Sequence, residues 1–397
     1  MKILSVHNYY GRYAPGGDVN AMEAEAQLLI DHGHAVSKYA RTNAEIYEDG
    51  TLAEKIAAFR NTAWSKRSYT EIKGIIQTIR PDIMHVHNYW LVLSPSIFAA
   101  AKDCGVATIF TLHNYRLICP GNHLLRNGRI CEACLHGHPW RVLLNRCLPG
   151  RSLMKSFLSL LLYRETKRKR FLDAWVDAYI ALSDFGRSKF IEAGLSETKV
   201  FVKPNFIKDP FHGVPIEKNK TCGALFAGRL SPEKGVETLL KAWAGLDYPL
   251  FIAGDGPARG YLQKKAPPSV TFGGWQNREN ILKLLQEATC FIFPSELYEG
   301  FGLSLLEAMA CGKAIIASDL GPRREMIKDG ISGLLFKAGN TVDLRSKIDL
   351  VLGDRTMRQS MGAVARKTYL ERYTPEINYE ILMKIYETAR TRSTSHK

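Results

Sequence analysis

The stretch EGFGLSLLEAMACGKAIIAS at residues 299–318 contains a glycine-bearing loop, an apolar helix and a strand. It follows another strand-like segment, TCFIFPS at 289–295, so that strand, helix and strand alternate. This alternation is typical of a parallel sheet covered by helices. Glu307 stands among leucine, alanine and methionine residues of the helix, eight positions after Glu299. Because a buried carboxylate is costly without a partner, we expect Glu307 to meet a basic side chain or a ligand.

The same alternation runs through both halves of the chain. Strand-like apolar segments are separated by segments with helical periodicity, which predicts an α/β protein with two doubly wound, Rossmann-like domains facing a cleft. In open sheets of this kind a ligand sits outside the carboxyl ends of the strands. The expected strands are 2–7, 34–40, 82–88, 106–114, 176–183, 199–207, 222–228, 249–254, 269–274, 289–295 and 313–318.

Domain boundaries follow from length and local composition. A chain of 397 residues favours two domains. We interpret the polar stretch at 206–220, which contains prolines and a glycine, as the linker between them. We therefore expect a first domain at 1–205, with an insert at 116–170, and a second domain at 206–370. Residues 371–397 are expected to form a helix that packs back on the first domain, followed by a tail.

The composition is that of a soluble protein with an excess of positive charge. No apolar run is long enough to span a membrane, and the start, MKILSVHNYY, is typical of a strand and not of a secretory signal. We therefore expect a cytoplasmic protein with reduced cysteines. The net charge is +15, and residues 116–170 alone contribute +10 from twelve basic and two acidic residues. Such a balance favours an anionic partner: nucleic acid, a phosphorylated small molecule or an anionic membrane surface.

Charged residues gather where strands of the second half end. GRLSPEKG at 228–235 supplies Arg229 and Lys234, and GDGP at 254–257 follows the next strand. Glycines and helix N-termini let backbone N–H groups approach an anion, and the two glutamates of 299–318 can accept hydrogen bonds from hydroxyls. A nucleotide sugar has both features. The alternative is a solvated turn at 228–235, an internal salt bridge at Glu307 and a simple turn at GDGP.

The two glutamates form an E-x7-E pattern that resembles the signature of the family 4 retaining glycosyltransferases, which have the GT-B fold. Four further segments resemble motifs of that family and occur in the expected order: APGGDVN at 14–20, TLHN at 111–114, GRLSPEKG at 228–235 and DGISGLLF at 329–336. The resemblance covers about residues 1–115 and 176–390. Several motifs in order are far more specific than any one of them.

The resemblance implies an enzyme that moves a sugar from a nucleotide-sugar donor to a saccharide or lipid-linked acceptor, with retention of anomeric configuration, in polysaccharide or glycolipid synthesis. It implies that the first domain binds the acceptor and the second the donor, without a catalytic metal. His113 and Glu299 take the catalytic roles, although His113 read alone is more often a structural histidine at a strand end. The donor-binding residues would be Gly16, Gly17, Arg229, Lys234, Gly254, Glu299, Phe301, Gly302, Leu303 and Glu307. His85 and His87 share one face of a strand, and we interpret them as structural.

The insert at 116–170 departs from the family pattern. Its cysteines are spaced C-x11-C-x2-C-x12-C, which is typical of a structural zinc site. The alternative is four unconnected thiols. The zinc ligands would be Cys119, Cys131, Cys134 and Cys147.

The end of the insert, 151–170, is apolar over its first two thirds and basic at its end. Such a helix is typical of a membrane interface and would hold the protein on the inner face of an anionic membrane. The alternative is a helix packed within the first domain.

Two other functions compete with the glycosyltransferase reading. Another GT-B enzyme, such as a sugar-nucleotide epimerase, would share the fold, but the continuous E-x7-E pattern argues against it. A nucleic-acid-binding protein could use the basic insert, but that insert lacks interleaved aromatic residues, so we expect no nucleic-acid partner.

Overall fold

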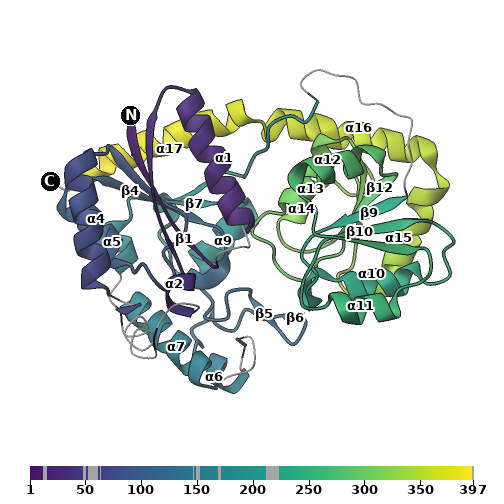
Figure 1. The fold of residues 1–397 in the computed structure, drawn as a ribbon, viewed down its shortest axis with the longest axis horizontal. Helices are drawn as coiled ribbons and strands as arrows, with labels where there is room; N and C mark the ends of the chain where they lie inside the picture. The colour runs from purple at the N-terminus through teal and green to yellow at the C-terminus, as the bar shows by residue number, and fades with distance from the viewer. Residues whose placement is uncertain are drawn as a thin grey trace. The chain divides into compact units, whose positions relative to one another are not determined.

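The computed structural model describes residues 1–11, 16–47, 51, 61–62, 64–145, 147–148, 153–168, 171–211 and 223–395. The chain forms two compact units (Figure 1). The first contains Met1–Leu124, Cys131–Asn205 and Asn378–Lys397, and the second contains Leu125–Ile130 and Phe206–Ile377. Part of the expected linker, 212–220, lies outside the described residues.

The first unit is built on a six-stranded sheet in which every pairing is parallel. The strand order is β2-β1-β3-β4-β7-β8. Strands β3, β4 and β7 are buried along their whole length, as expected where helices cover both faces. The strands are β1 (Lys2–Tyr9), β2 (Ala35–Thr42), β3 (Ile83–Val86), β4 (Ala107–Leu112), β7 (Ala178–Ala181) and β8 (Val200–Val202).

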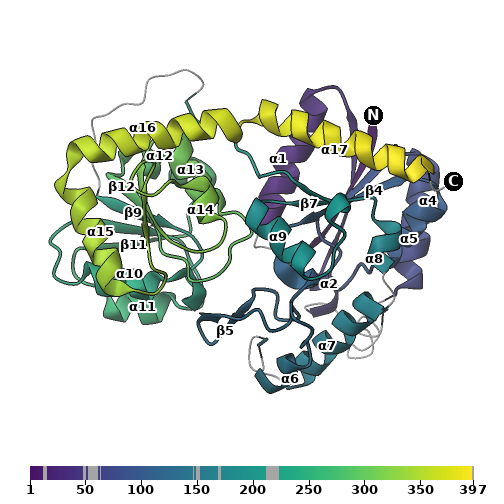
Figure 2. The same ribbon diagram turned by 180° about the vertical axis from the view of Figure 1, so that it is seen from behind.

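One face of this sheet is covered by the first helix and the last helix of the chain (Figures 1 and 2). Leu29 of α1 (Gly17–Asp31) and Tyr386 of α17 (Pro375–Ser395) share a core cluster with strand residues such as Ile109. Residues 378–397 thus belong to the first unit. The other helices of this unit are α2 (Ala44–Tyr47), α4 (Lys66–Ile79), α5 (Ser96–Asp103), η1 (Tyr115–Leu117), α6 (Arg141–Asn145), α7 (Leu153–Arg168), α8 (Phe171–Trp175), α9 (Asp184–Glu192) and η3 (Glu197–Lys199).

The second unit repeats the design with a parallel sheet in the order β11-β10-β9-β12-β13-β14. Its core includes fully buried Trp243 and Ile292. The strands are β9 (Ala224–Ala227), β10 (Leu250–Ala253), β11 (Val270–Gly274), β12 (Cys290–Phe293), β13 (Ala314–Ser318) and β14 (Leu334–Phe336). The helices are η4 (Pro232–Lys234), α10 (Val236–Trp243), α11 (Arg259–Lys265), α12 (Arg278–Glu287), α13 (Leu303–Ala310), α14 (Arg323–Met326), α15 (Thr341–Gly353) and α16 (Arg355–Arg372).

Two parallel sheets covered by helices confirm the expected α/β class with two doubly wound units. The insert adds a short antiparallel hairpin, β5 (Leu125–Arg126) and β6 (Arg129–Ile130), which sequence periodicity did not predict. In the described part of the chain, no helix combines the length and the apolar character needed to cross a membrane.

Candidate functional site

Three loops of the second unit lie at one edge of its sheet because their strands are neighbours. Strands β10, β9 and β12 are adjacent and parallel, so the loops at 228–235, 254–257 and 294–302 follow their carboxyl ends. This is the edge at which open α/β sheets bind ligands. The loops carry Arg229, Lys234, Gly254, Glu299, Phe301 and Gly302.

Glu299 is a nearly buried carboxylate that accepts hydrogen bonds from Lys234 and Ser295. Lys234 donates from Nζ to Oε1 over 2.7 Å, and Ser295 donates from Oγ to the same oxygen over 2.7 Å. Burial alone would raise the pKa of Glu299, but the charge and hydrogen bond of Lys234, together with the Ser295 bond, outweigh burial and lower it. Glu299 is therefore ionised at neutral pH, and Lys234 keeps a fixed position beside it.

Glu307 on α13 is nearly buried and has a weaker partner. Arg278 approaches with Nε 3.4 Å from Oε1, but its side chain is 50% exposed, so water screens its charge. Burial raises the pKa of Glu307 to about 7 against this opposing charge. The protein thus leaves the carboxyl only partly compensated. From the sequence we expect Glu307 to meet a basic side chain or a ligand. The basic side chain, Arg278, is present but does not offset the cost of burying the carboxylate, so a ligand could still stabilise it.

The loop before α13 is shaped by Phe301 and Gly302. Phe301 is buried and packs edge-on against Tyr373, with ring centroids 5.7 Å apart. Gly302 has φ of 103° and is the N-cap of α13, whose first residue is Leu303. Glycine has no side chain that could cap the helix, so the N-cap residue offers the first backbone N–H groups of α13 no side-chain acceptor. Uncapped helix starts are typical anion-binding positions.

Gly254 has a packing reason for its small size. A Cβ there would lie 1.9 Å from the carbonyl oxygen of Gly228, so only glycine lets the ends of β9 and β10 approach this closely. The structure thus gives Gly254 a role in joining the two loops, and its role toward a donor stays a prediction. Arg229, one position after Gly228, is exposed beside this junction.

The expected glycine loop of the first unit lies at the start of α1. Gly16 is the N-cap of that helix and Gly17 its first residue. Ala14 and Pro15 of the same motif lie outside the described residues. Gly16, Gly17 and His113 all belong to the first unit, whereas the charged donor candidates belong to the second.

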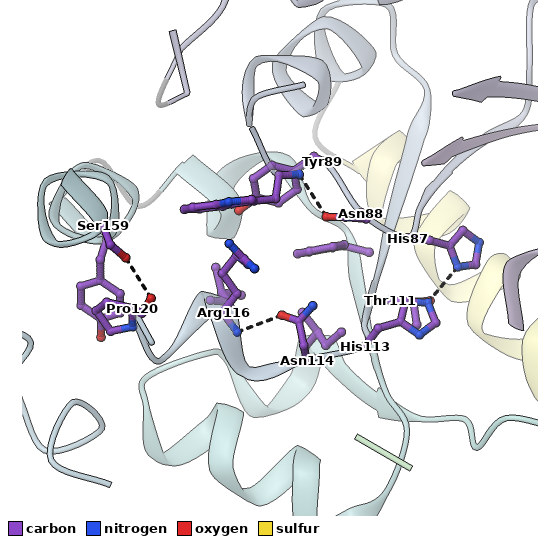
Figure 3. Close-up of a pocket in the computed structure, with 14 residues that line it drawn as sticks. His87, Asn88, Tyr89, Thr111, His113, Asn114, Arg116, Pro120 and Ser159 are labelled. Atoms are coloured by element: carbon purple, nitrogen blue, oxygen red, sulfur yellow. Dashed lines mark hydrogen bonds between the residues drawn. The ribbon is translucent and has the colours of Figure 1, made fainter. Parts of the chain in front are cut away.

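His113 follows β4 and lines a pocket of the first unit (Figure 3). Burial, followed by the charge of His7, lowers the pKa of His113 to about 3, so its imidazole is neutral at physiological pH. Arg116 lies with its guanidinium carbon 4.3 Å from the ring centroid of Trp90, a cation–π arrangement in the pocket wall. The other lining residues are His87, Asn88, Tyr89, Phe110, Thr111, Leu112, Asn114, Leu117, Pro120, Ser159 and Tyr163.

His87, which the sequence leads us to interpret as structural, lies beside His113 in this pocket. Its Nδ1 lies 3.1 Å from Nε2 of His113, and it lines the same pocket. The signal in the sequence was the spacing of His85 and His87, which puts both side chains on one face of β3. That spacing could not indicate His113 as a neighbour, because the contact depends on β3 and β4 lying side by side.

Cys119 and Cys134 of the insert are in contact. Hydrogen bonds from Cys134 and from backbone N–H groups of the following turn outweigh burial and lower the pKa of the Cys119 thiol to about 7. A Cβ built on Gly121 would lie 3.6 Å from Sγ of Cys119 and 3.1 Å from Cβ of Cys147, so Cys147 is close as well. Cys131 donates its backbone N–H to the carbonyl oxygen of Leu124 over 2.8 Å. Zinc at these cysteines stays a prediction.

Helix α7 of the insert has two different faces. Ser159 and Tyr163 line the pocket beside His113, and Ser159 donates to the carbonyl oxygen of Pro120 over 2.9 Å. On another face, Leu153, Met154, Phe157 and Leu161 are exposed; α6 packs beside α7, and exposed Leu144 of α6 and Trp140 just before it add two more. We call these six residues the apolar patch: Trp140 (49% exposed), Leu144 (72%), Leu153 (53%), Met154 (66%), Phe157 (46%) and Leu161 (41%).

Two family models match consecutive parts of the chain. Residues 15–209 match the model described as Glycosyltransferase Family 4, and residues 209–368 match the model described as Glycosyl transferases group 1. An uncharacterized glycosyltransferase of Methanocaldococcus jannaschii is 32% identical over 174 residues, which are 42% of this chain and 44% of that protein. The alignments with this and two other proteins of that organism cover 44 to 64% of their lengths, so the chain spans about half the length of these relatives.

One relative has a lipid-linked substrate in its name. The N,N'-diacetylbacillosaminyl-diphospho-undecaprenol alpha-1,3-N-acetylgalactosaminyltransferase of Campylobacter jejuni is 39% identical over 110 residues, 28% of this chain and 29% of that protein. Among solved structures, HepE of Anabaena in complex with UDP aligns with a TM-score of 0.67 at 18% identity, covering 98% of this chain and 100% of that one. This likeness confirms the expected GT-B fold. The comparisons described give no support to an epimerase or a nucleic-acid-binding protein.

Proposed function

Because the chain belongs to the family 4 glycosyltransferases, we propose that it transfers a sugar from a nucleotide-sugar donor to a lipid-linked or other saccharide acceptor, with retention of anomeric configuration. The observation that carries this proposal is the pair of nearly buried glutamates, Glu299 in the loop after β12 and Glu307 on α13: Lys234 holds Glu299, and Arg278 compensates Glu307 only partly. Carboxylates in such positions are suited to hydroxyl groups of a sugar and of a ribose.

Each group at this edge has a task in the transfer. Arg229 and Lys234 neutralise the diphosphate and stabilise it as it leaves the sugar. The start of α13 adds backbone N–H groups and the positive end of its dipole. Glu299 binds hydroxyls of the transferred sugar, and Glu307 binds the ribose hydroxyls. The leaving diphosphate helps to take the proton of the acceptor hydroxyl that attacks the anomeric carbon.

Ligand-induced stabilisation tests this function directly. The full chain is heated with nucleoside diphosphates and their sugars, and the correct donor nucleotide should raise the melting temperature most, since a ligand at 100 times its Kd stabilises by about 2.7 kcal/mol. Proton NMR of the product then gives the anomeric configuration. The proposal fails if no nucleotide stabilises the protein, and an inverted product removes the retaining mechanism.

We further propose that the apolar patch binds an anionic membrane and that the acceptor is a lipid-linked saccharide. An exposed patch of six large apolar side chains is unusual on a soluble surface. It lies in the segment 116–170, which carries +10, and exposed Arg141 and Arg164 flank it on α6 and α7. Apolar residues with a basic surround suit a bilayer with anionic headgroups. Ser159 and Tyr163 of the same helix line the His113 pocket, so α7 would bring a lipid-linked acceptor close to it.

We also propose that Cys119, Cys131, Cys134 and Cys147 bind one structural zinc ion. The contact between Cys119 and Cys134 and the closeness of Cys147 support this proposal. Four thiolates would complete a closed tetrahedral shell without an open position for chemistry. The ion would order a segment whose own strands are only two residues long.

A further inference from the structure

Next to the His113 pocket, the first unit contains a cluster of buried polar side chains that contact one another and that the proposed function does not use. Glu25 lies on α1, His85 and His87 lie on or next to β3, and Lys203 follows β8. Each of the four is 4% exposed or less. A core with ionised residues needs an explanation, because apolar residues of similar volume are often at least as stabilising.

Glu25 lies at the centre of this cluster. Its Oε2 lies 2.8 Å from Nζ of Lys203, and its Oε1 lies 2.9 Å from Nδ1 of His85. The same Oε1 lies 3.5 Å from Nε2 of His87. Lys203 also donates to Oδ1 of Asn378 over 3.0 Å. The carboxylate therefore has a full counter-charge in Lys203.

A metal ion is the first alternative for such a cluster. Glu25, His85 and His87 each offer a ligand atom, and the three atoms lie within 4.8 Å of one another. However, the ammonium group of Lys203 already neutralises Glu25. His85 is further engaged through Nε2, 2.7 Å from Oγ1 of Thr111. Nδ1 of His85 also lies 2.9 Å from the hydroxyl of Tyr386. The cluster is therefore satisfied without a cation, and His87 links it to His113.

The link to His113 passes through His87 (Figure 3). Nδ1 of His87 and Nε2 of His113 are 3.1 Å apart, so one of the two atoms carries the proton between the rings. The carboxylate of Glu25 lies on the Nε2 side of His87 and favours a proton there. A neutral His87 with its proton on Nε2 has a bare Nδ1, which can only accept. His113 must then donate from Nε2, and its own Nδ1 is the acceptor.

We propose that Glu25, Lys203 and His87 are positioning residues that fix His113 as a neutral imidazole protonated on Nε2, so that its Nδ1 accepts a hydrogen bond from a substrate hydroxyl. This inference rests on the proposed function for the substrate that His113 meets. The role of Lys203 is to keep the Glu25 charge from drawing a second proton onto the histidines. Without Lys203, the same carboxylate would stabilise a charged His87.

The other titratable groups around His113 agree with a neutral ring. Burial lowers the pKa of His87 well below its usual range, and burial also lowers that of His7 on β1, although Asp18 and Glu23 oppose the shift at His7. Positive charge on His7, Lys203 or His85 would also lower the pKa of His113, and the charge of Glu25 opposes them. The imidazole therefore has no second proton to give at neutral pH, and the tautomer decides what it can do.

The test is nitrogen NMR of the full chain labelled with 15N-histidine, in which a protonated and a bare ring nitrogen give distinct shifts. The His113 signals are identified by their loss in His113→Gln. We expect protonated Nε2 and bare Nδ1 in the wild type, and the reverse in Glu25→Gln, where the charge that orders His87 is gone. A wild-type His113 protonated on Nδ1, or a tautomer unchanged in Glu25→Gln, overturns the proposal.

Two further variants keep the result interpretable. Glu25→Gln combined with Lys203→Met removes both charges and avoids a lone buried lysine, so it should fold where the single change does not. The matched control is Glu71→Gln, which disturbs the partly buried ion pair with Arg41 and the pair with Arg67 in the same unit and should leave the His113 spectrum unchanged. With a donor in hand, the double variant should lower kcat by roughly 10-fold or more while donor KM stays within about 2-fold, as for loss of an outer partner. The NMR result needs no turnover, so it fails separately from the proposed function.

Discussion

Replacing Glu307 with glutamine should stabilise the unliganded protein at pH 8, although it removes a residue that the proposed function needs. The physical reason is the burial of the carboxyl on α13, which raises its pKa from 4.5 to about 7. At 1.36 kcal/mol per pKa unit, that shift corresponds to a penalty of about 3 kcal/mol for the ionised form in the folded state. Glutamine has nearly the same shape and no charge at any pH.

The sign of the pH dependence follows from the raised pKa. Below pH 4.5 the carboxyl is protonated in both folded and unfolded chains, so it contributes nothing to the difference. Between about pH 4.5 and 7 the unfolded chain ionises and the folded one does not, so the free energy of unfolding falls as pH rises. Above pH 7 the penalty of about 3 kcal/mol is constant. Glu307→Gln should lack this decline.

The assay is thermal unfolding of wild type and Glu307→Gln from pH 4.5 to 8.5 without nucleotide. In a unit of this size each kcal/mol shifts the melting temperature by about 2–4 °C, so a penalty of about 3 kcal/mol should widen the gap to about 6–12 °C at pH 8. Glu279→Gln is the control, because Glu279 is 74% exposed in the same unit. Parallel pH profiles for wild type and Glu307→Gln would refute the reasoning.

Nucleotide binding should respond in the opposite direction. Ribose hydroxyls donate hydrogen bonds, so they prefer the ionised carboxylate, and affinity in the wild type should fall by up to about 10-fold per pH unit below pH 7. Because a terminal phosphate also titrates near pH 6, the comparison with Glu307→Gln isolates the carboxyl. Calorimetry in buffers of different ionisation enthalpy should show more proton release on binding to the wild type than on binding to Glu307→Gln.

Three other predictions concern separate parts of the molecule. Glu299→Ala should cost on the order of 2–4 kcal/mol of transition-state stabilisation, measured as kcat/KM with the identified donor, and wild-type turnover would remove Glu299 from the site. Purified protein without a polyhistidine tag should contain about one zinc per chain, and Cys131→Ser should lose the metal and melt earlier; less than about a tenth of an equivalent in the wild type counts against zinc. Phe157→Asp should weaken flotation with phosphatidylglycerol vesicles but not change nucleotide binding, whereas Val342→Asp, at a site 79% exposed in the second unit, should float like the wild type. If the wild type, Phe157→Asp and Val342→Asp all float equally, the apolar patch does not bind the membrane.

The sequence determined the fold class because the relevant signals are local. Apolar runs of four to eight residues alternate with segments of helical periodicity. The residues of each segment predict its conformation without information from distant parts of the sequence. Glu299 and Glu307 were found in the same way, because a loop and a helix of fixed length set their spacing. The sequence also indicated a turn at GDGP, which begins with Gly254. Only the structure shows that Gly254 packs against Gly228.

What only the tertiary structure decided is which distant groups meet and what burial does to them. The carboxylate of Glu25 on α1 contacts both His87, which follows β3, and Lys203, which follows β8, although β4 and β7 lie between these two strands in the sheet. No local pattern encodes a contact across 178 positions, and no pattern gives the exposed fraction that leaves Arg278 unable to offset the burial of Glu307. Electrostatic energies depend on distance and on exclusion of water, and both are properties of the folded chain.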